Sequence, residues 1–348
     1  MESRPDRHSE ALAEWLLQQL PESAAVLPLR PLPGDAGQRR YYELAAERRY
    51  LAVYSPPLSE PNRTFVAVTQ LLAANQLPVP KIFAVDFSRG FMLLQHLGAE
   101  PLRAAYAERG SEALQRGLAL LPALAAIDAS QLAWLPRYDA ARLQEEMALF
   151  AEWFVAALLA LPLSAGEREL LAALFAQLVE SALAQPQGFV HRDFHCRNLM
   201  LASGGADAGL GLIDYQDALV GPLNYDLVSL LKDCYWQWPE ATVDAAVADY
   251  YAAVIAVRQR APTLAQFRQG FDWIGLQRHI KVLGIFARLA LRDGKPQYLQ
   301  ALPLVIHYTL ETARRYPALH PFAQWFEQRL MPAIQRQHWY PSITEERR

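Results

Sequence analysis

The chain has 348 residues, of which 52% are hydrophobic and 20% charged, so it is long enough for two domains with substantial cores. Its net charge is -3 without a long run of one sign, which argues against a protein built to bind nucleic acid. The polar residues 1–10 lack the apolar core of a signal peptide, and no apolar run is long enough to span a bilayer. The cysteines Cys196 and Cys234 need no disulfide framework and indicate reduced thiols in a cytoplasmic protein.

The first third of the chain alternates strand patterns with helical ones. Apolar residues at helical spacing between residues 12 and 20 predict an amphipathic opening helix that packs on a core. A second helix is predicted at residues 65–74. Short apolar runs bounded by glycine and proline predict strands at residues 26–32, 41–44, 50–54, 82–86 and 91–94.

A loop bracketed by glycines separates the first two predicted strands. It consists of Gly34, Asp35, Ala36, Gly37, Gln38, Arg39 and Arg40. Such a loop can lay backbone N–H groups over nucleotide phosphates. A Gly-x-x-Gly pattern alone more often marks an ordinary hairpin turn, so the phosphate interpretation depends on finding a kinase-type catalytic loop further along the chain.

From residue 101 onward the patterns are mostly helical. Ser164 and Glu167 form the capping box that opens one of these helices. Helices are predicted at residues 114–127, 142–161, 164–184, 226–236, 239–257 and 263–292, with two more after them.

One stretch carries the groups that phosphoryl transfer to a hydroxyl needs. Such a reaction uses a carboxylate that orients and deprotonates the attacking hydroxyl, and an amide oxygen and a second carboxylate that hold Mg2+. Asp193 fits the first role, and Asn198 and Asp214 fit the other two. Asn198 and Asp214 flank two apolar runs, residues 199–202 and 210–213, which predict a hairpin. The spacing from His191 to Asn198 matches a kinase catalytic loop.

These motifs resemble the aminoglycoside phosphotransferase superfamily of kinase-like folds, on residues 191–198, 213–218 and 221–231. The resemblance implies an α+β, two-lobed protein-kinase-like fold with ATP and Mg2+ as cofactors. A small antiparallel-sheet N-lobe would span residues 1–97, and a larger, mainly helical C-lobe residues 98–348. The hinge residues Gln95, His96 and Leu97 would offer main-chain groups to adenine.

Residues 213–219 and 277–296 resemble one branch of that superfamily, the bacterial anomeric kinases of cell-wall recycling. This branch implies phosphorylation of the C1 hydroxyl of N-acetylmuramate, N-acetylglucosamine or both. We expect the protein to act as a monomer. The alternatives are a kinase of another small hydroxyl substrate, such as an aminoglycoside, a choline-like molecule or another sugar, and a non-catalytic binding module. A basic, aromatic segment at residues 328–340 disfavours a polycationic substrate.

The chain departs from the superfamily at a lysine–glutamate ion pair. The strand at residues 50–54 should carry the lysine and the next helix the glutamate, but the chain has Val53 and Phe65 in these regions. Loss of the lysine and the glutamate together avoids the cost of burying one of these charges without its partner. Arg39 or Arg40 could supply the missing positive charge, and the resembling branch also lacks this lysine.

Three further residues are candidates for substrate binding. Asp217 follows the metal-binding Asp214 by three residues and could accept hydrogen bonds from a sugar, or it could form a local turn. Arg278 and Lys281 are three residues apart, so they share one helix face. That face is either solvated or a clamp for the lactyl carboxylate of N-acetylmuramate.

Overall fold

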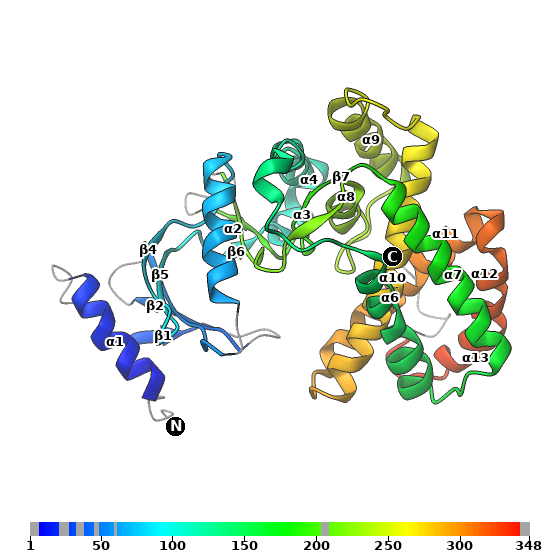
Figure 1. The fold of residues 1–348 in the computed structure, drawn as a ribbon. Coiled ribbons are helices and arrows are strands. Elements are labelled where there is room, and N and C mark those ends of the chain that lie inside the picture. Colours follow the sequence, from blue (N-terminus) through cyan, green and yellow to red (C-terminus); the bar gives the residue numbers. More distant parts are fainter. Residues whose placement is uncertain are drawn as a thin grey trace. The chain divides into compact units, whose positions relative to one another are not determined.

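The computed structural model describes residues 7–20, 28–32, 38–44, 49–58, 61–202 and 209–341. The chain divides into two compact units, each built from two stretches of sequence (Figure 1). The first comprises Met1–Ala123 and Arg197–Ala218, and the second Leu124–Cys196 and Leu219–Arg348. The predicted catalytic stretch therefore contributes to both units. A functional lobe boundary at residue 97 stays a prediction.

The first unit contains a five-stranded antiparallel sheet in the order β1-β2-β3-β5-β4. The predicted strands are confirmed within the described residues, and the one predicted at residues 26–32 begins at Leu29. The strands are β1 (Leu29–Pro31), β2 (Arg40–Leu44), β3 (Tyr50–Tyr54), β4 (Ile82–Asp86) and β5 (Phe91–Gln95).

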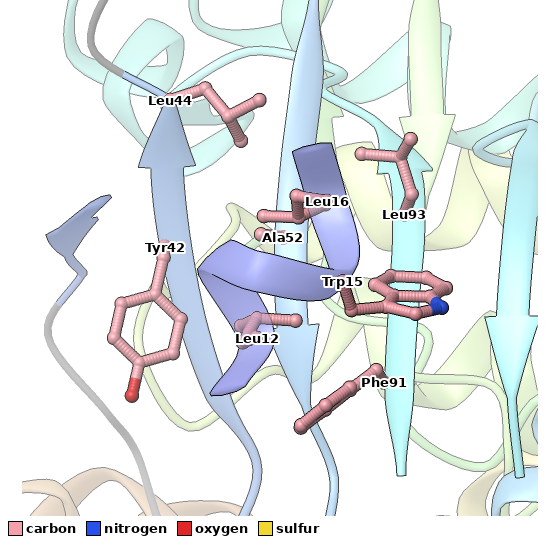
Figure 2. Close-up of a cluster of buried hydrophobic side chains, with 8 residues drawn as sticks. All are labelled: Leu12, Trp15, Leu16, Tyr42, Leu44, Ala52, Phe91 and Leu93. Atoms are coloured by element: carbon pink, nitrogen blue, oxygen red, sulfur yellow. The ribbon is translucent and has the colours of Figure 1, made fainter. Parts of the chain in front are cut away.

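Helix α1 (Arg7–Gln19) covers one face of this sheet, and α2 (Asn62–Ala74) lies on the other side (Figure 1). Alternate strand residues point to the same face, so Tyr42 and Leu44 of β2 both meet α1. Figure 2 shows the buried cluster that results, which consists of Leu12, Trp15, Leu16, Tyr42, Leu44, Ala52, Phe91 and Leu93. The predicted core-packing role of the opening helix is confirmed.

A second, three-stranded sheet in the first unit has the order β6-β8-β9, with strands β6 (Glu100–Pro101), β8 (Leu199–Leu201) and β9 (Leu210–Leu212). Leu199 pairs with Leu212 in antiparallel register, as the predicted hairpin requires. The chain between these strands lies partly outside the described residues. Strand β6 leads into helices α3 (Arg103–Arg109) and α4 (Ser111–Leu118).

The continuous helix predicted at residues 114–127 is wrong. The structure has α4 and a separate short helix, α5 (Leu121–Ala125). Pro122 lacks the N–H that would continue the hydrogen bonds of α4.

The second unit is mainly helical around one two-stranded antiparallel ladder, β7 (Gln187–Val190) with β10 (Leu219–Pro222). Its helical elements are η1 (Ala129–Leu132), α6 (Ala140–Leu149), η2 (Phe150–Leu158), α7 (Ala165–Ala184), α8 (Asn224–Leu231), α9 (Glu240–Tyr250), η3 (Tyr251–Ile255), α10 (Leu264–Leu291), η4 (Pro296–Ala301), α11 (Leu302–Arg315), η5 (Pro317–Leu319), α12 (His320–Trp325), η6 (Phe326–Leu330) and α13 (Met331–Ile334).

Local capping and competing hydrogen bonds set several of these helix ends. The predicted capping box of Ser164 and Glu167 opens α7. The helix predicted to reach residue 236 instead ends at Leu231. The Asp233 carboxylate accepts a hydrogen bond from the Tyr235 N–H at 2.9 Å, which replaces the helical bond there.

Helix α10 is the centre of the second unit, with contacts to α6, η2, α7, α8 and α11. It is buried along most of its length. A Cβ at Gly284 would lie 2.4 Å from the carbonyl carbon of Leu149, so only glycine permits this close approach to α6. Within the described residues, no helix is long and apolar enough to cross a membrane.

Candidate active site

The loop that carries the predicted catalytic Asp193 follows strand β7 in the second unit. Arg192 has a φ of 76°, a left-handed conformation that is costly for a non-glycine residue. Asp226, on helix α8, accepts hydrogen bonds from the backbone N–H groups of His191 at 2.7 Å and Arg192 at 3.1 Å. Its carboxylate holds the loop in this conformation. Burial raises the pKa of Asp226 to about 7, against the lowering effect of the two N–H groups.

Asp193 is half-buried on this loop and is surrounded by positive charge. Burial by itself disfavours its ionised form. The charges of Lys281, His195, Arg192 and Arg278 outweigh that effect and lower the pKa of Asp193 below its ordinary value. The carboxylate is therefore ionised at neutral pH and can accept a hydrogen bond, and then a proton, from a hydroxyl.

Glu146 of α6 forms salt bridges with two of these cations, Arg192 and Lys281. One of its oxygens, Oε1, accepts hydrogen bonds from Arg192 Nη2 at 2.5 Å and from Lys281 Nζ at 3.2 Å. The other, Oε2, accepts a short hydrogen bond from the Tyr138 hydroxyl. Burial opposes ionisation of Glu146, but Lys281 and Arg192 prevail and its pKa is lowered. The result is a buried, ionised carboxylate that fixes Arg192 and Lys281 beside the catalytic loop.

Glu146 was not among the residues predicted from the sequence. A signal was present, because Glu146 lies in the apolar stripe formed by Leu143, Met147 and Phe150, where a charged residue needs a buried partner. The identity of the partners was not visible, because Arg192 and Lys281 come from distant segments.

Arg278 and Lys281 are both buried, with exposed fractions of 4% and 8%, so the solvated-face alternative is wrong. Lys281 is occupied by Glu146 and by the Tyr225 hydroxyl, which is 3.2 Å from its Nζ. Arg278 differs, because its buried Nη1 has no hydrogen-bond partner among the described residues. Burial works against the charge of Arg278, yet Tyr225, Cys234, Asp233 and Asp193 raise its pKa. Arg278 thus remains a cation with donor capacity to spare.

The predicted metal ligands Asn198 and Asp214 lie side by side in the first unit. Asn198 precedes β8, and Asp214 follows β9 with a left-handed φ of 67°. The backbone N–H of Ile213 donates to the Asn198 carbonyl at 3.1 Å, which fixes the two segments together. Asn198 Nδ2 lies 3.3 Å from Asp214 Oδ2. Asp214 is exposed, so its carboxylate is open to a cation.

This donor set fits Mg2+ bound to a nucleotide. Mg2+ prefers oxygen ligands and is usually held by one or two carboxylates together with substrate phosphates and waters. Asn198 and Asp214 offer an amide oxygen and a carboxylate. Across the described residues, no group of three or more His, Cys, Asp or Glu residues is placed to hold a metal. The pair therefore fits a cation that arrives with its own phosphate ligands.

Gln216, a residue not predicted from the sequence, links Asp214 to Arg39. Its Nε2 donates to Asp214 Oδ1 at 2.7 Å, and its Oε1 accepts from Arg39 Nη1 at 3.2 Å. Arg39 also donates to the Ser55 hydroxyl at 2.9 Å. Of the two arginines considered as replacements for the missing lysine, Arg39 is half-buried beside the metal ligands, whereas Arg40 is exposed.

An aromatic stack occupies the region where the superfamily has its ion pair. The Arg39 guanidinium lies 5.0 Å from the centroid of the Phe65 ring, and Phe65 of α2 stacks on Tyr215 at 5.4 Å. The Tyr215 hydroxyl is 2.9 Å from that of Thr69. Val53 is fully buried and has no charge to pair with this helix. The stack joins α2 to the segment that carries Asp214 without a buried salt bridge.

The other predicted nucleotide residues remain predictions. Gly34, Asp35, Ala36 and Gly37 lie outside the described residues. Gln38 and Arg40 are exposed and, with Arg39, line a hollow of about 650 Å3.

The predicted hinge and the sugar ligand Asp217 also remain predictions. The N–H groups of Gln95 and His96 donate to the carbonyls of Lys81 and Arg49, both at 2.8 Å. These two donors are thus committed to the sheet. Leu97 packs against Gly211. Asp217 is exposed.

Residues 28–265 match the phosphotransferase enzyme family, so the chain belongs to this family, as the motifs predicted. It is 38% identical over 325 residues to the N-acetylmuramate/N-acetylglucosamine kinase of Pseudomonas aeruginosa, covering 90% of this chain and 94% of that protein. It is 36% identical over 317 residues to the kinase of the same name from Neisseria meningitidis, covering 89% and 92%.

Solved structures confirm the predicted kinase-like fold. The GDP complex of aminoglycoside 2'-phosphotransferase-IIIa matches with a TM-score of 0.61 at 16% identity, covering 88% of this chain and 99% of that one. A choline/ethanolamine kinase family protein from Mesorhizobium loti matches with a TM-score of 0.60 at 13% identity, covering 91% and 99%. A streptomycin–ATP complex of APH(2")-IIa has a TM-score of 0.58 at 15% identity, covering 86% and 97%.

Proposed function

We propose that this chain is a sugar 1-kinase that transfers the terminal phosphoryl group of ATP to the anomeric hydroxyl of N-acetylmuramate, N-acetylglucosamine or both. The observation that carries the proposal is Asp193, an ionised carboxylate on a loop fixed by Asp226. Family membership supports the reaction class, and relatives named N-acetylmuramate/N-acetylglucosamine kinase that align with 89–90% of the chain support the substrate.

Asp193 would act on the acceptor hydroxyl. Its carboxylate accepts a hydrogen bond from the C1 hydroxyl, aims the oxygen at the phosphorus and takes up the proton as the bond to phosphorus forms. The anomeric hydroxyl is more acidic than an ordinary alcohol, so a carboxylate with a lowered pKa suffices as the base. Most of the acceleration would come from positioning the reactants.

The metal and nucleotide would be held in the first unit. Asn198 and Asp214 would hold Mg2+, which when bound supplies positive charge to the transferring phosphoryl group. Arg39 would supply a second positive charge through its position beside Gln216 and Asp214. The loop of Gly34 to Arg40 would contact the phosphates, and residues 95–97 the adenine edge.

Arg278 is our candidate ligand for the lactyl carboxylate of N-acetylmuramate, because it is buried, charged and has an unused donor atom. Lys281 would not bind the substrate carboxylate as predicted, because its ammonium group already contacts Glu146 and the Tyr225 hydroxyl. It would instead act on Asp193 through its charge. Asp217 would accept hydrogen bonds from sugar hydroxyls. We also propose that the protein acts as a cytoplasmic monomer in peptidoglycan recycling. The substrate named for its relatives supports this setting.

The test is ATP consumption with N-acetylmuramate, N-acetylglucosamine, aminoglycosides and choline, followed by phosphorus NMR of the product. We expect a sugar 1-phosphate from the acetylated sugars. The variant Asp193→Asn should bind ATP normally and turn over at least about a hundredfold more slowly. A phosphate on another hydroxyl, preference for choline or an aminoglycoside, or near-normal turnover by Asp193→Asn would each contradict the proposal.

A further inference from the structure

A hollow of about 960 Å3 in the second unit has no role in the proposed reaction. The last turns of α7, the residues before β7, the loop before α10 and the first turns of α10 form its wall. Gln187 of this wall begins β7, whereas the catalytic loop follows Val190 at the other end of the strand. Three residue steps along a strand separate the two ends by about 10 Å. The hollow is therefore distinct from the catalytic loop.

The wall is rich in neutral amides. They are Gln177, Gln185, Gln187, Asn224, Gln259, Gln266 and Gln269. Two aromatic side chains, Phe267 and Trp273, lie among them. Amides form hydrogen bonds in both directions, and aromatic rings offer flat apolar surface. This combination suits a ligand that has many hydroxyl or amide groups and also apolar C–H faces.

Hydrogen bonds between the amides fix their orientation. Gln185 Nε2 donates to the Gly270 carbonyl at 3.1 Å, and Gln185 Oε1 accepts from Asn224 Nδ2 at 3.0 Å. A Cβ at Gly270 would lie 3.1 Å from Gln185 Cδ, so the glycine lets this amide lie close against α10. A wall with fixed side chains loses little conformational freedom when a ligand binds.

Three buried atoms in this wall have no hydrogen-bond partner among the residues that the structure describes. They are Gln177 Oε1, Asn224 Oδ1 and Trp273 Nε1. Buried polar atoms are nearly always paired. All three atoms belong to side chains that line the hollow, so a ligand there is a partner that small rotations of these side chains would reach. An acetamido group offers one N–H and one carbonyl oxygen, and sugar hydroxyls offer further donors. These donors and the carbonyl oxygen match the two unpaired acceptors and the one unpaired donor.

Charge at the hollow favours a neutral ligand. Arg258, the half-buried cation in the wall, already donates to the backbone carbonyls of Val254 at 3.2 Å and Ala125 at 2.7 Å. Glu180 and Arg260 are of opposite charge and lie exposed at the rim. Two of the three nitrogens of Arg258 are thus committed to the fold and the two rim charges cancel, so hydroxyl and amide groups find more partners in the wall than a charged group does. The volume is at the upper end of small-molecule sites, about 300–1,000 Å3, and has room for more than one sugar ring.

We infer that this hollow is a second ligand site, for a neutral acetamido saccharide of one or two rings. The site differs from the proposed kinase site in its residues and in its lack of an anchoring charge. The probe that tests it is the methyl glycoside of N,N'-diacetylchitobiose, whose blocked C1 oxygen cannot be phosphorylated. Binding is measured by calorimetry on the full chain without nucleotide, so the result does not depend on kinase activity.

Two neighbouring positions at the end of α7 give a matched pair of variants. Ala184 is exposed and lines the hollow, so Ala184→Trp fills it. Leu183 is 46% exposed and is not part of the wall, so Leu183→Trp adds the same side chain outside it. We expect wild type and Leu183→Trp to bind alike and Ala184→Trp at least tenfold more weakly, with equal melting temperatures. Trp273→Phe, which keeps a ring and loses the donor, should bind about tenfold more weakly.

No binding by the wild-type chain would overturn the inference, as would equal affinities of Ala184→Trp and Leu183→Trp. Maltose, which lacks acetamido groups, should bind at least tenfold more weakly, and equal affinity for maltose would overturn the assigned ligand class. Turnover of N-acetylglucosamine is measured on the same preparations. Normal turnover with no probe binding would reject this site and leave the proposed kinase function intact.

Discussion

Replacing Arg278 with methionine tests how the proposed active site would distinguish its two sugars. Methionine keeps most of the buried side-chain volume and removes the guanidinium. N-acetylmuramate carries a lactyl carboxylate that N-acetylglucosamine lacks. If Arg278 binds this carboxylate, Arg278→Met should impair N-acetylmuramate turnover much more than N-acetylglucosamine turnover.

The size of the effect follows from the surroundings of Arg278. The side chain is 4% exposed, and its Nη1 is unbonded among the described residues, so a carboxylate there would be well shielded from water. A hydrogen bond between charged groups in such a place contributes about 1.5–3 kcal/mol. Its loss should therefore reduce kcat/KM for N-acetylmuramate by about ten- to a hundredfold.

The assay measures kcat/KM for both sugars on one preparation at fixed ionic strength, so that general damage to the fold cancels in the ratio. Lys281→Met is the control, because Lys281 is bound to Glu146 and Tyr225 and should affect both sugars equally. Equal losses on the two sugars with Arg278→Met, or a selective loss with Lys281→Met, would refute this assignment of the two cations.

Three further predictions concern the metal, the missing ion pair and pH. Asp214→Ala should abolish the Mg2+-dependent part of ATP affinity, and calorimetry that shows it unchanged would contradict the metal assignment. Val53→Lys should destabilise the chain by about 3–5 kcal/mol relative to Val53→Met, and a higher melting temperature with tighter ATP binding would count against this. Because Asp193 has a lowered pKa and must be ionised, removing the charge of Lys281 should raise that pKa, so Lys281→Met should move the acid limb of kcat/KM for N-acetylglucosamine to higher pH. If Lys281→Met left the acid limb of the pH profile unchanged, the charge of Lys281 would not set the pKa of Asp193.

Local patterns in the sequence were sufficient for much of the sheet and for the spacing of the catalytic motif. Strand β3 spans the predicted residues 50–54, an apolar run that is followed by Pro56 and Pro57. The hairpin of β8 and β9 followed from two short apolar runs. The end of α8 was not predictable, because residues 226–236 contain no glycine or proline. The helix ends where the Tyr235 N–H donates to the Asp233 side chain in place of a backbone carbonyl.

Tertiary contacts account for most of what the sequence did not reveal. A spacing of three residues placed Arg278 and Lys281 on one face of a helix, but α10 is buried on most of its faces, so the spacing could not show whether that face is solvated. Glu146 and Gln216 each bind a partner far along the chain, Lys281 for one and Arg39 for the other. Such pairs are set by packing, which a pattern within one segment does not encode.

The stack of Arg39, Phe65 and Tyr215 has a consequence for inhibitor selectivity. Compounds that gain affinity for kinases by hydrogen bonding to a lysine–glutamate pair would meet two aromatic rings and a buried valine in this chain. Donor groups aimed at the glutamate would lose water without gaining a carboxylate partner, which weakens binding. Flat apolar groups aimed at Phe65 and Tyr215 should instead favour this protein over kinases that retain the ion pair.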